Sequence, residues 1–119
     1  MAVANKPPQA YREFMARFPK LGRAWDLAGE AGSEGPLDAK SVRLIKLAVA
    51  MGAMREGAVH SSVRKAVAAG ATADEIDQVT ALCAGTLGFP SVVALYSWTR
   101  DVLGAGESGS RSRTRRRRT

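Results

Sequence analysis

The chain has 119 residues, an apolar fraction of 45% and a formal charge of +7, which fits a single domain with a packed core. It contains one histidine, His60, and one cysteine, Cys83, which excludes an internal disulfide and a zinc site built only from soft ligands. No segment has the ~20 apolar residues of a membrane span, and residues 1–10 lack the apolar stretch of a signal peptide, so we expect a cytoplasmic protein.

Two helices are predicted near the start of the chain. Residues 1–8 include two prolines and little apolar content, so we expect a flexible N-terminus. Between residues 9 and 32, apolar residues recur at gaps of three and four, which is typical of amphipathic helices. Pro19 divides this segment, because proline disfavours helix in the preceding residue. The apolar positions are Tyr11, Phe14, Met15, Phe18, Leu21, Trp25, Leu27 and Ala28.

The middle of the chain predicts two further helices. Residues 40–54 follow Asp38, a plausible N-cap, and are apolar almost all round, which is typical of a helix buried on more than one side. Residues 55–69 return to an amphipathic pattern, and Gly70 follows as a natural C-terminal cap.

The last third predicts a helix after Thr72, which forms a capping box with Glu75, and a final helix from Pro90 to about residue 103. No sustained alternation indicates a strand. We therefore predict a compact all-α domain of five or six helices over residues 9–104. The two most apolar helices carry more apolar surface than a monomer of this size covers, which favours a homo-oligomer.

The end of the chain, residues 105–119, holds much of the positive charge. Six of the 18 basic residues lie in this tail, and residues 1–106 have a net charge of only +2. No apolar residue follows Ala105, and such a segment cannot offset its ordering entropy, so we expect disorder. Residues 111–118 are expected to bind an anionic partner weakly and without specificity, or to be a solvated terminus. The tail arginines are Arg111, Arg113, Arg115, Arg116, Arg117 and Arg118.

Three segments resemble the carboxymuconolactone decarboxylase-like family, which includes alkylhydroperoxidase D. They are residues 37–50, residues 64–76 with their Ala-Gly-Ala-Thr-x-x-Glu-Ile pattern, and the Gly-Phe-Pro turn at 88–90. The resemblance covers about residues 36–103 and implies an all-α fold of the alkylhydroperoxidase D-like type. It also implies assembly as a trimer or hexamer.

The peroxidase branch of that family has a Cys-x-x-Cys pair, a histidine after it and a glutamate before it. Counting back from Gly70 without gaps, those four positions fall on Arg55, Ala58, Ser62 and Arg43. A dithiol peroxidase needs an attacking and a resolving thiol. The resemblance therefore implies the branch that lacks the cysteine pair, and a peroxidase role is a distant alternative.

The decarboxylase branch usually has a histidine where this chain has Ser62, and here the histidine lies two residues earlier. Glu56 and His60 are four residues apart, so they share a helix face and form a candidate acid/base pair. Arg43, Arg55 and Ser62 are candidate substrate-binding residues, since arginine pairs well with a carboxylate.

Two functions follow from these residues. The first is a lyase of the decarboxylase type that acts on a small carboxylate or lactone, with Glu56 and His60 as the catalytic pair at a subunit interface. The second is a non-catalytic oligomeric module whose tail recruits an anionic partner. No cofactor is expected, and a metal site is expected only if carboxylates or a second subunit complete it. Cys83 is expected to be a buried small hydrophobe.

Overall fold

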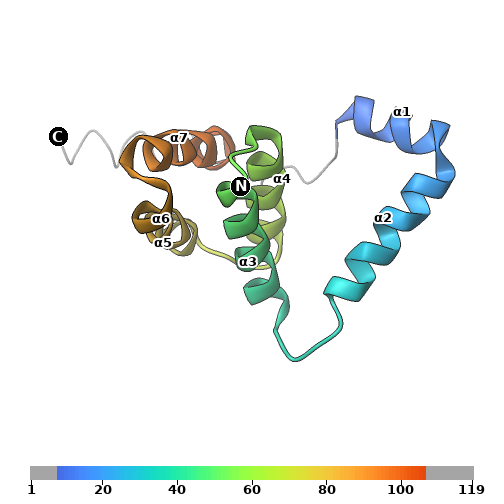
Figure 1. Cartoon of the computed structure of the whole chain (residues 1–119), viewed down its shortest axis with the longest axis horizontal. Helices are drawn as coiled ribbons and strands as arrows, with labels where there is room; N and C mark the ends of the chain where they lie inside the picture. Colours follow the sequence, from blue (N-terminus) through green and yellow to red (C-terminus); the bar gives the residue numbers. More distant parts are fainter. Residues whose placement is uncertain (1–7, 107–119) are drawn as a thin grey trace.

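The computed structural model describes residues 8–106, and every regular element in that range is a helix (Figure 1), as the all-α prediction requires. Residues 1–7 and 107–119 lie outside the described residues, so the predictions of a flexible N-terminus and a basic, disordered tail stay predictions. The helices are α1 Gln9–Arg17, α2 Pro19–Gly32, α3 Ala39–Gly52, α4 Glu56–Ala68, α5 Ala73–Leu82, α6 Ala84–Leu87 and α7 Phe89–Gly106.

Helix boundaries follow the predicted caps closely. The side chain of Asp38 accepts a hydrogen bond from Ser41 N–H at the start of α3, and Thr72 and Glu75 form a complete capping box at the start of α5. Gly70 adopts a positive φ of 100° after α4. The described residues form seven helices, whereas five or six were predicted, because the chain turns at Cys83 and the four-residue α6 follows separately.

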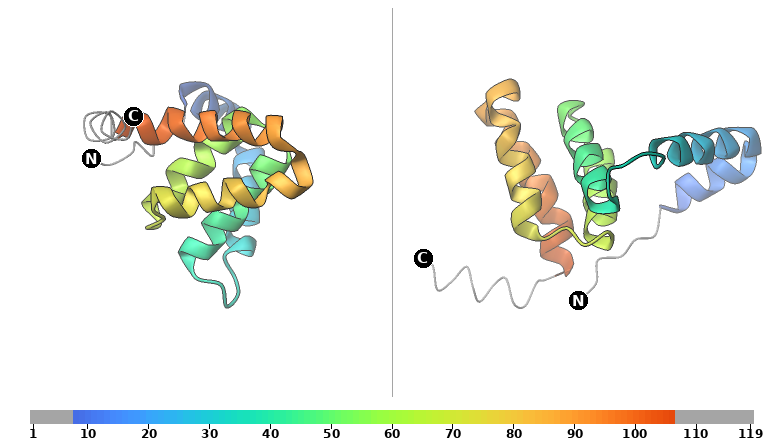
Figure 2. Two further views of the ribbon diagram at one scale, coloured as in Figure 1. Left: turned by 90° about the vertical axis from the view of Figure 1, so that its left-hand side faces the viewer. Right: turned by 90° about the horizontal axis from the view of Figure 1, so that it is seen from below.

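The core is formed by α3, α4, α5 and α7. Figures 1 and 2 show α3 and α4 side by side, with α7 crossing over α4 and α5 packed against α7. This arrangement lets each of the four helices bury one face against two others. The fully buried large side chains are Leu47, Met51, Ile76, Leu95, Leu103, Val59, Val63 and Thr99.

The two N-terminal helices stand apart from this core. α1 and α2 pack mainly on each other and project away from α3–α7, so the described chain measures 51 Å along its longest axis (Figures 1 and 2). We call residues 9–32 the arm. No residue of the arm is buried. The predicted amphipathic pattern is confirmed as helix, but its apolar side has no cover within the described chain.

No helix in the described residues has both the length and the apolar character that crossing a membrane requires.

Candidate functional site

The connection between α3 and α4 sets the direction of α4. Met54 lies in the left-handed region, with φ 53°. Its N–H bonds the carbonyl of Met51, and the N–H of Arg55 bonds the carbonyl of Ala50. These two bonds form a Schellman motif, which usually has glycine at the left-handed position. Because only three residues join the helices, Glu56 starts α4 at a defined rotation relative to α3.

His60 lies one turn after Glu56 and meets a carboxylate from the other end of the core. Its Nε2 atom is 3.0 Å from Oδ2 of Asp101 in α7 and 3.8 Å from Oε2 of Glu56. The side chain of His60 is 26% exposed, whereas those of Glu56 and Asp101 are 55% and 56% exposed. The predicted pair is therefore brought together, and Asp101 makes the closer contact.

The hydrogen bond to Asp101 determines which ring nitrogen of His60 carries the proton. An ionised carboxylate can only accept, so Nε2 must donate to Asp101. In the neutral ring, Nδ1 then has the free lone pair. At 3.8 Å, Glu56 is too far from Nε2 for a good hydrogen bond, and its carboxylate is available to other groups.

Asp101 faces His60 because its neighbour fixes the rotation of α7. Arg100 forms an ion pair with Asp77 of α5, and its guanidinium lies 4.5 Å from the centroid of the Tyr96 ring. Consecutive helical residues project about 100° apart. With Arg100 on the α5 side, Asp101 is directed toward α4. Asp101 was not predicted from the sequence, because no local spacing relates it to a residue 41 positions earlier.

The other predicted binding residues lie around this cluster rather than in it. Arg55 directly precedes Glu56 and is exposed. Ser62 follows His60 by two residues, about 200° around α4, so it lies on a different face of the helix. Arg43 is half-buried on α3 and is close enough to Lys65 for its charge to help lower the pKa of that lysine, an effect due mainly to burial. No side-chain hydrogen bond or ion pair joins these three residues to His60 in the described part of the chain.

Within residues 8–106, Glu56, His60 and Asp101 also form a group that could hold a metal ion. Their donor atoms all lie within 4.8 Å of one another. Two ligands bound at about 2.1 Å lie roughly 3.0–3.4 Å apart around one ion, so the spacing of His60 and Asp101 already fits and Glu56 needs only a small rotation. The two carboxylates supply the ligands that His60 and Cys83 alone could not.

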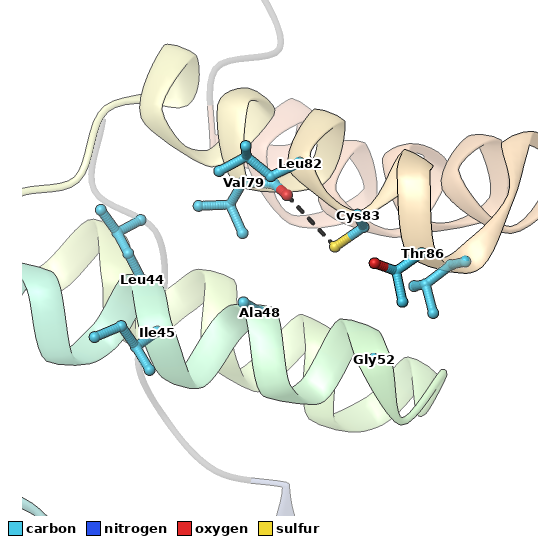
Figure 3. Close-up of a pocket in the computed structure, with 9 residues that line it drawn as sticks. Leu44, Ile45, Ala48, Gly52, Val79, Leu82, Cys83 and Thr86 are labelled. Atoms are coloured by element: carbon cyan, nitrogen blue, oxygen red, sulfur yellow. Dashed lines mark hydrogen bonds between the residues drawn. The ribbon is translucent and has the colours of Figure 1, made fainter.

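Cys83 lies in a different part of the molecule. Figure 3 shows it in an apolar pocket of about 390 Å³ between α3 on one side and α5 and α6 on the other. Its thiol donates to the carbonyl of Val79 at 3.4 Å, and burial raises the pKa of the Cys83 thiol. The residue is half-buried, which agrees in part with the predicted buried hydrophobe. None of the three site residues lines this pocket.

Comparison with known proteins supports the resemblance. Neither the curated proteins nor the solved structures include a match to this chain. The sequence profile of the carboxymuconolactone decarboxylase family, however, matches residues 19–101, which include all of α2 to α6 and the His60–Asp101 pair. The absence of a Cys-x-x-Cys pair agrees with the single cysteine. Because the match covers well over half of the sequence, this chain belongs to the carboxymuconolactone decarboxylase family.

Proposed function

We propose that this protein is a decarboxylase-type lyase acting on a small carboxylated lactone, with His60 as its acid/base group. The observation that carries the proposal is the 3.0 Å hydrogen bond between His60 Nε2 and Asp101, which orients the ring and defines its tautomer. The family profile supports the choice of reaction, since its description refers to decarboxylation of carboxymuconolactone.

The reaction needs proton transfer and no electron acceptor. Loss of CO₂ breaks a carbon–carbon bond, and the electron pair left behind is delocalised into the lactone carbonyl. A proton must then be added to carbon. The protonated imidazole of His60 can supply that proton and regain one from water. With Nε2 bonded to Asp101, Nδ1 is the atom that gives and receives the transferred proton.

Two neighbouring residues fit supporting roles in this reaction. Glu56 has an exposed carboxylate beside the ring that can accept a hydrogen bond from a substrate hydroxyl or a water molecule. Arg55, exposed at the start of α4, is a candidate partner for the substrate carboxylate. Arg43 and Ser62 are weaker candidates for substrate binding. Arg43 lies on α3, and Ser62 lies on a different face of α4 from His60.

Replacing His60 by glutamine tests the proposal directly. We expect kcat for release of CO₂ from carboxymuconolactone to fall by about 10²–10⁴, the usual contribution of an acid/base group. Asp101→Asn should reduce kcat by about tenfold or more, because an amide no longer specifies the tautomer of the ring. Gln78→Ala, an exposed change on α5, is the matched control and should retain full activity.

The oligomer size of each variant should be measured by light scattering alongside activity. Lost turnover with unchanged size and unchanged circular dichroism supports a chemical role for His60. Wild-type protein without turnover of carboxymuconolactone, or a His60→Gln variant with full turnover, would overturn the proposal.

Metal treatment separates acid/base chemistry from metal-assisted chemistry at the same three side chains. If His60 acts as an acid/base group, activity survives EDTA, and added Zn²⁺ inhibits because it replaces the hydrogen bond of Nε2 with a coordinate bond. The chain has one histidine, so its ring signals in an NMR spectrum report this directly. Activity that EDTA removes and Zn²⁺ restores would contradict the acid/base role and would define a metal centre at Glu56, His60 and Asp101.

A further inference from the structure

The arm, residues 9–32, has an apolar side that nothing in the described chain covers. Helices of nine and 14 residues are marginal in water without tertiary packing, yet α1 and α2 bury none of their residues. Phe14 and Phe18 contact each other, with ring centroids 5.2 Å apart, and both remain about half exposed. Leu21 and Trp25, one turn apart on α2, are 49% and 57% exposed. The arm therefore needs an apolar surface supplied from outside this chain's own core.

The core presents a surface of matching character. The pocket between α3 and α5–α6 is lined by no charged residue, and the hydroxyl of Thr86 and the thiol of Cys83 are its only polar side-chain groups (Figure 3). Its rim is also apolar, since Ile45 and Leu82 line it and are 49% and 73% exposed. Val49, one turn after Ile45, adds to this exposed face at 68%. We call this pocket and its rim the groove. The groove offers few polar groups to orient a small ligand.

We propose that the arm of one chain docks in the groove of a second copy of the same chain. The two surfaces occur once each per chain, so reciprocal exchange between two copies gives each arm and each groove a partner. Aromatic side chains bury about 150–250 Å² each, so four half-exposed aromatic residues and a half-exposed leucine offer roughly 500 Å² per arm. Two arms and two grooves then bury about 2,000 Å², which exceeds the ~1,600 Å² of a standard stable interface. The five residues are Tyr11, Phe14, Phe18, Leu21 and Trp25.

The groove lies on α3, α5 and α6, whereas Glu56, His60 and Asp101 lie on α4 and α7, so arm docking does not depend on the proposed chemistry. The arm and the groove are the two specific surfaces that would meet in the predicted homo-oligomer. Trp25 is the best candidate for the dominant contact, since tryptophan is the residue most enriched among energetically important interface positions.

Cross-linking of two differently marked chains tests the proposal. One chain has Trp25→Cys with Cys83→Ala, and the other has Leu82→Cys with Cys83→Ala and a removable tag, so each has a single thiol. After mixing and gentle oxidation, we expect a disulfide between the two kinds of chain. The matched control replaces Trp25→Cys by Arg23→Cys, an exposed position about 200° away around α2, and should cross-link at least about tenfold less.

A second measurement keeps the proposal falsifiable if a cysteine variant folds poorly. Light scattering on the full chain should show wild-type protein larger than its 12.6 kDa monomer. Trp25→Glu should raise the dissociation constant at least about tenfold while the circular dichroism stays helical. A monomeric wild-type protein, or equal cross-linking from Trp25→Cys and Arg23→Cys, would overturn the proposal. So would a disulfide formed within one chain that has Trp25→Cys, Leu82→Cys and Cys83→Ala together. The last result would mean that the arm folds back on its own groove.

Discussion

The closest side-chain partner of His60 is Asp101, which lies 41 residues away in the sequence. The carboxylate of Asp101 specifies the proton position on the ring, and Arg100 beside it fixes the rotation of α7. Glu56, the residue found by spacing alone, lies farther from the ring at 3.8 Å. At the residue scale, the helical pair at i and i+4 was therefore predictable, whereas the closer partner required the packing of α7 on α4.

Cys83 leads to a prediction about reactivity. Burial raises the pKa of its thiol, so less of the nucleophilic thiolate is present at a given pH. We expect alkylation by iodoacetamide at pH 8 to be at least about tenfold slower in the folded protein than in urea. The reaction is measured by mass spectrometry, and the single cysteine makes the result unambiguous.

A matched variant places the single thiol at an exposed position on α5, the helix that directly precedes Cys83. Gln78→Cys with Cys83→Ala has its thiol at an exposed position of α5 and should react at similar rates folded and unfolded. Equal rates for folded and unfolded wild-type protein would show that the thiol of Cys83 is accessible and reactive, contrary to the effect of burial.

At the scale of the helices, Glu75 connects the N-terminal ends of α3 and α5. Its Oε1 atom accepts from the N–H of Thr72 at 2.9 Å, which closes the capping box of α5. Its Oε2 atom accepts from Nζ of Lys40 at 2.9 Å, which ties α5 to the first turn of α3. The hydrogen bond from Lys40, followed by that from Thr72, holds the pKa of Glu75 below its ordinary value.

The lowered pKa of Glu75 predicts a pH-dependent contribution to stability. A carboxylate with a depressed folded pKa stabilises the protein above its unfolded pKa of about 4.5, and this contribution is lost as the pH falls through the lower folded value. Glu75→Gln keeps an oxygen for the cap but loses the ion pair. We therefore expect it to be less stable than wild type at pH 7, with the difference shrinking below about pH 4.5.

Urea unfolding followed by circular dichroism at pH 7 and pH 3 measures this difference. Thr72→Ala is the comparison, since it removes the side-chain cap and leaves Lys40 and Glu75 in place, and should cost about 1 kcal/mol at both pH values. A difference between wild type and Glu75→Gln that stays constant from pH 7 to pH 3 would contradict the assignment.

Local physics explains why the helix ends were predictable. Asp38, Gly70 and the Thr72–Glu75 box each satisfy backbone groups within a few residues, so their signal is present in the sequence itself. The break at Cys83 was not predicted, because no proline marks the position. The periodicity of the arm correctly indicated helix with an apolar side, but periodicity does not specify what that side packs against.

For the whole molecule, the charge and the apolar surface are separated along the chain. Residues 1–106 have a net charge of only +2, so the described part offers little general attraction to polyanions. The alternative function, recruitment of an anionic partner, therefore depends on residues 107–119 and stays a prediction. The homo-oligomer also stays a prediction, and the apolar residues that it would cover are exposed on the arm and on α7, among them Trp25, Phe89 and Val93.

The Schellman motif at Met54 limits how this site can vary. One residue inserted between α3 and α4 would replace the Schellman motif by a longer loop, so the direction in which α4 leaves α3 would no longer be defined although Glu56, His60 and Asp101 all remained in the sequence. Glycine at position 54 would relieve the left-handed strain without changing that direction. In judging which relatives share the proposed chemistry, the number of residues between the end of α3 and the histidine therefore matters as much as the presence of Glu56, His60 and Asp101.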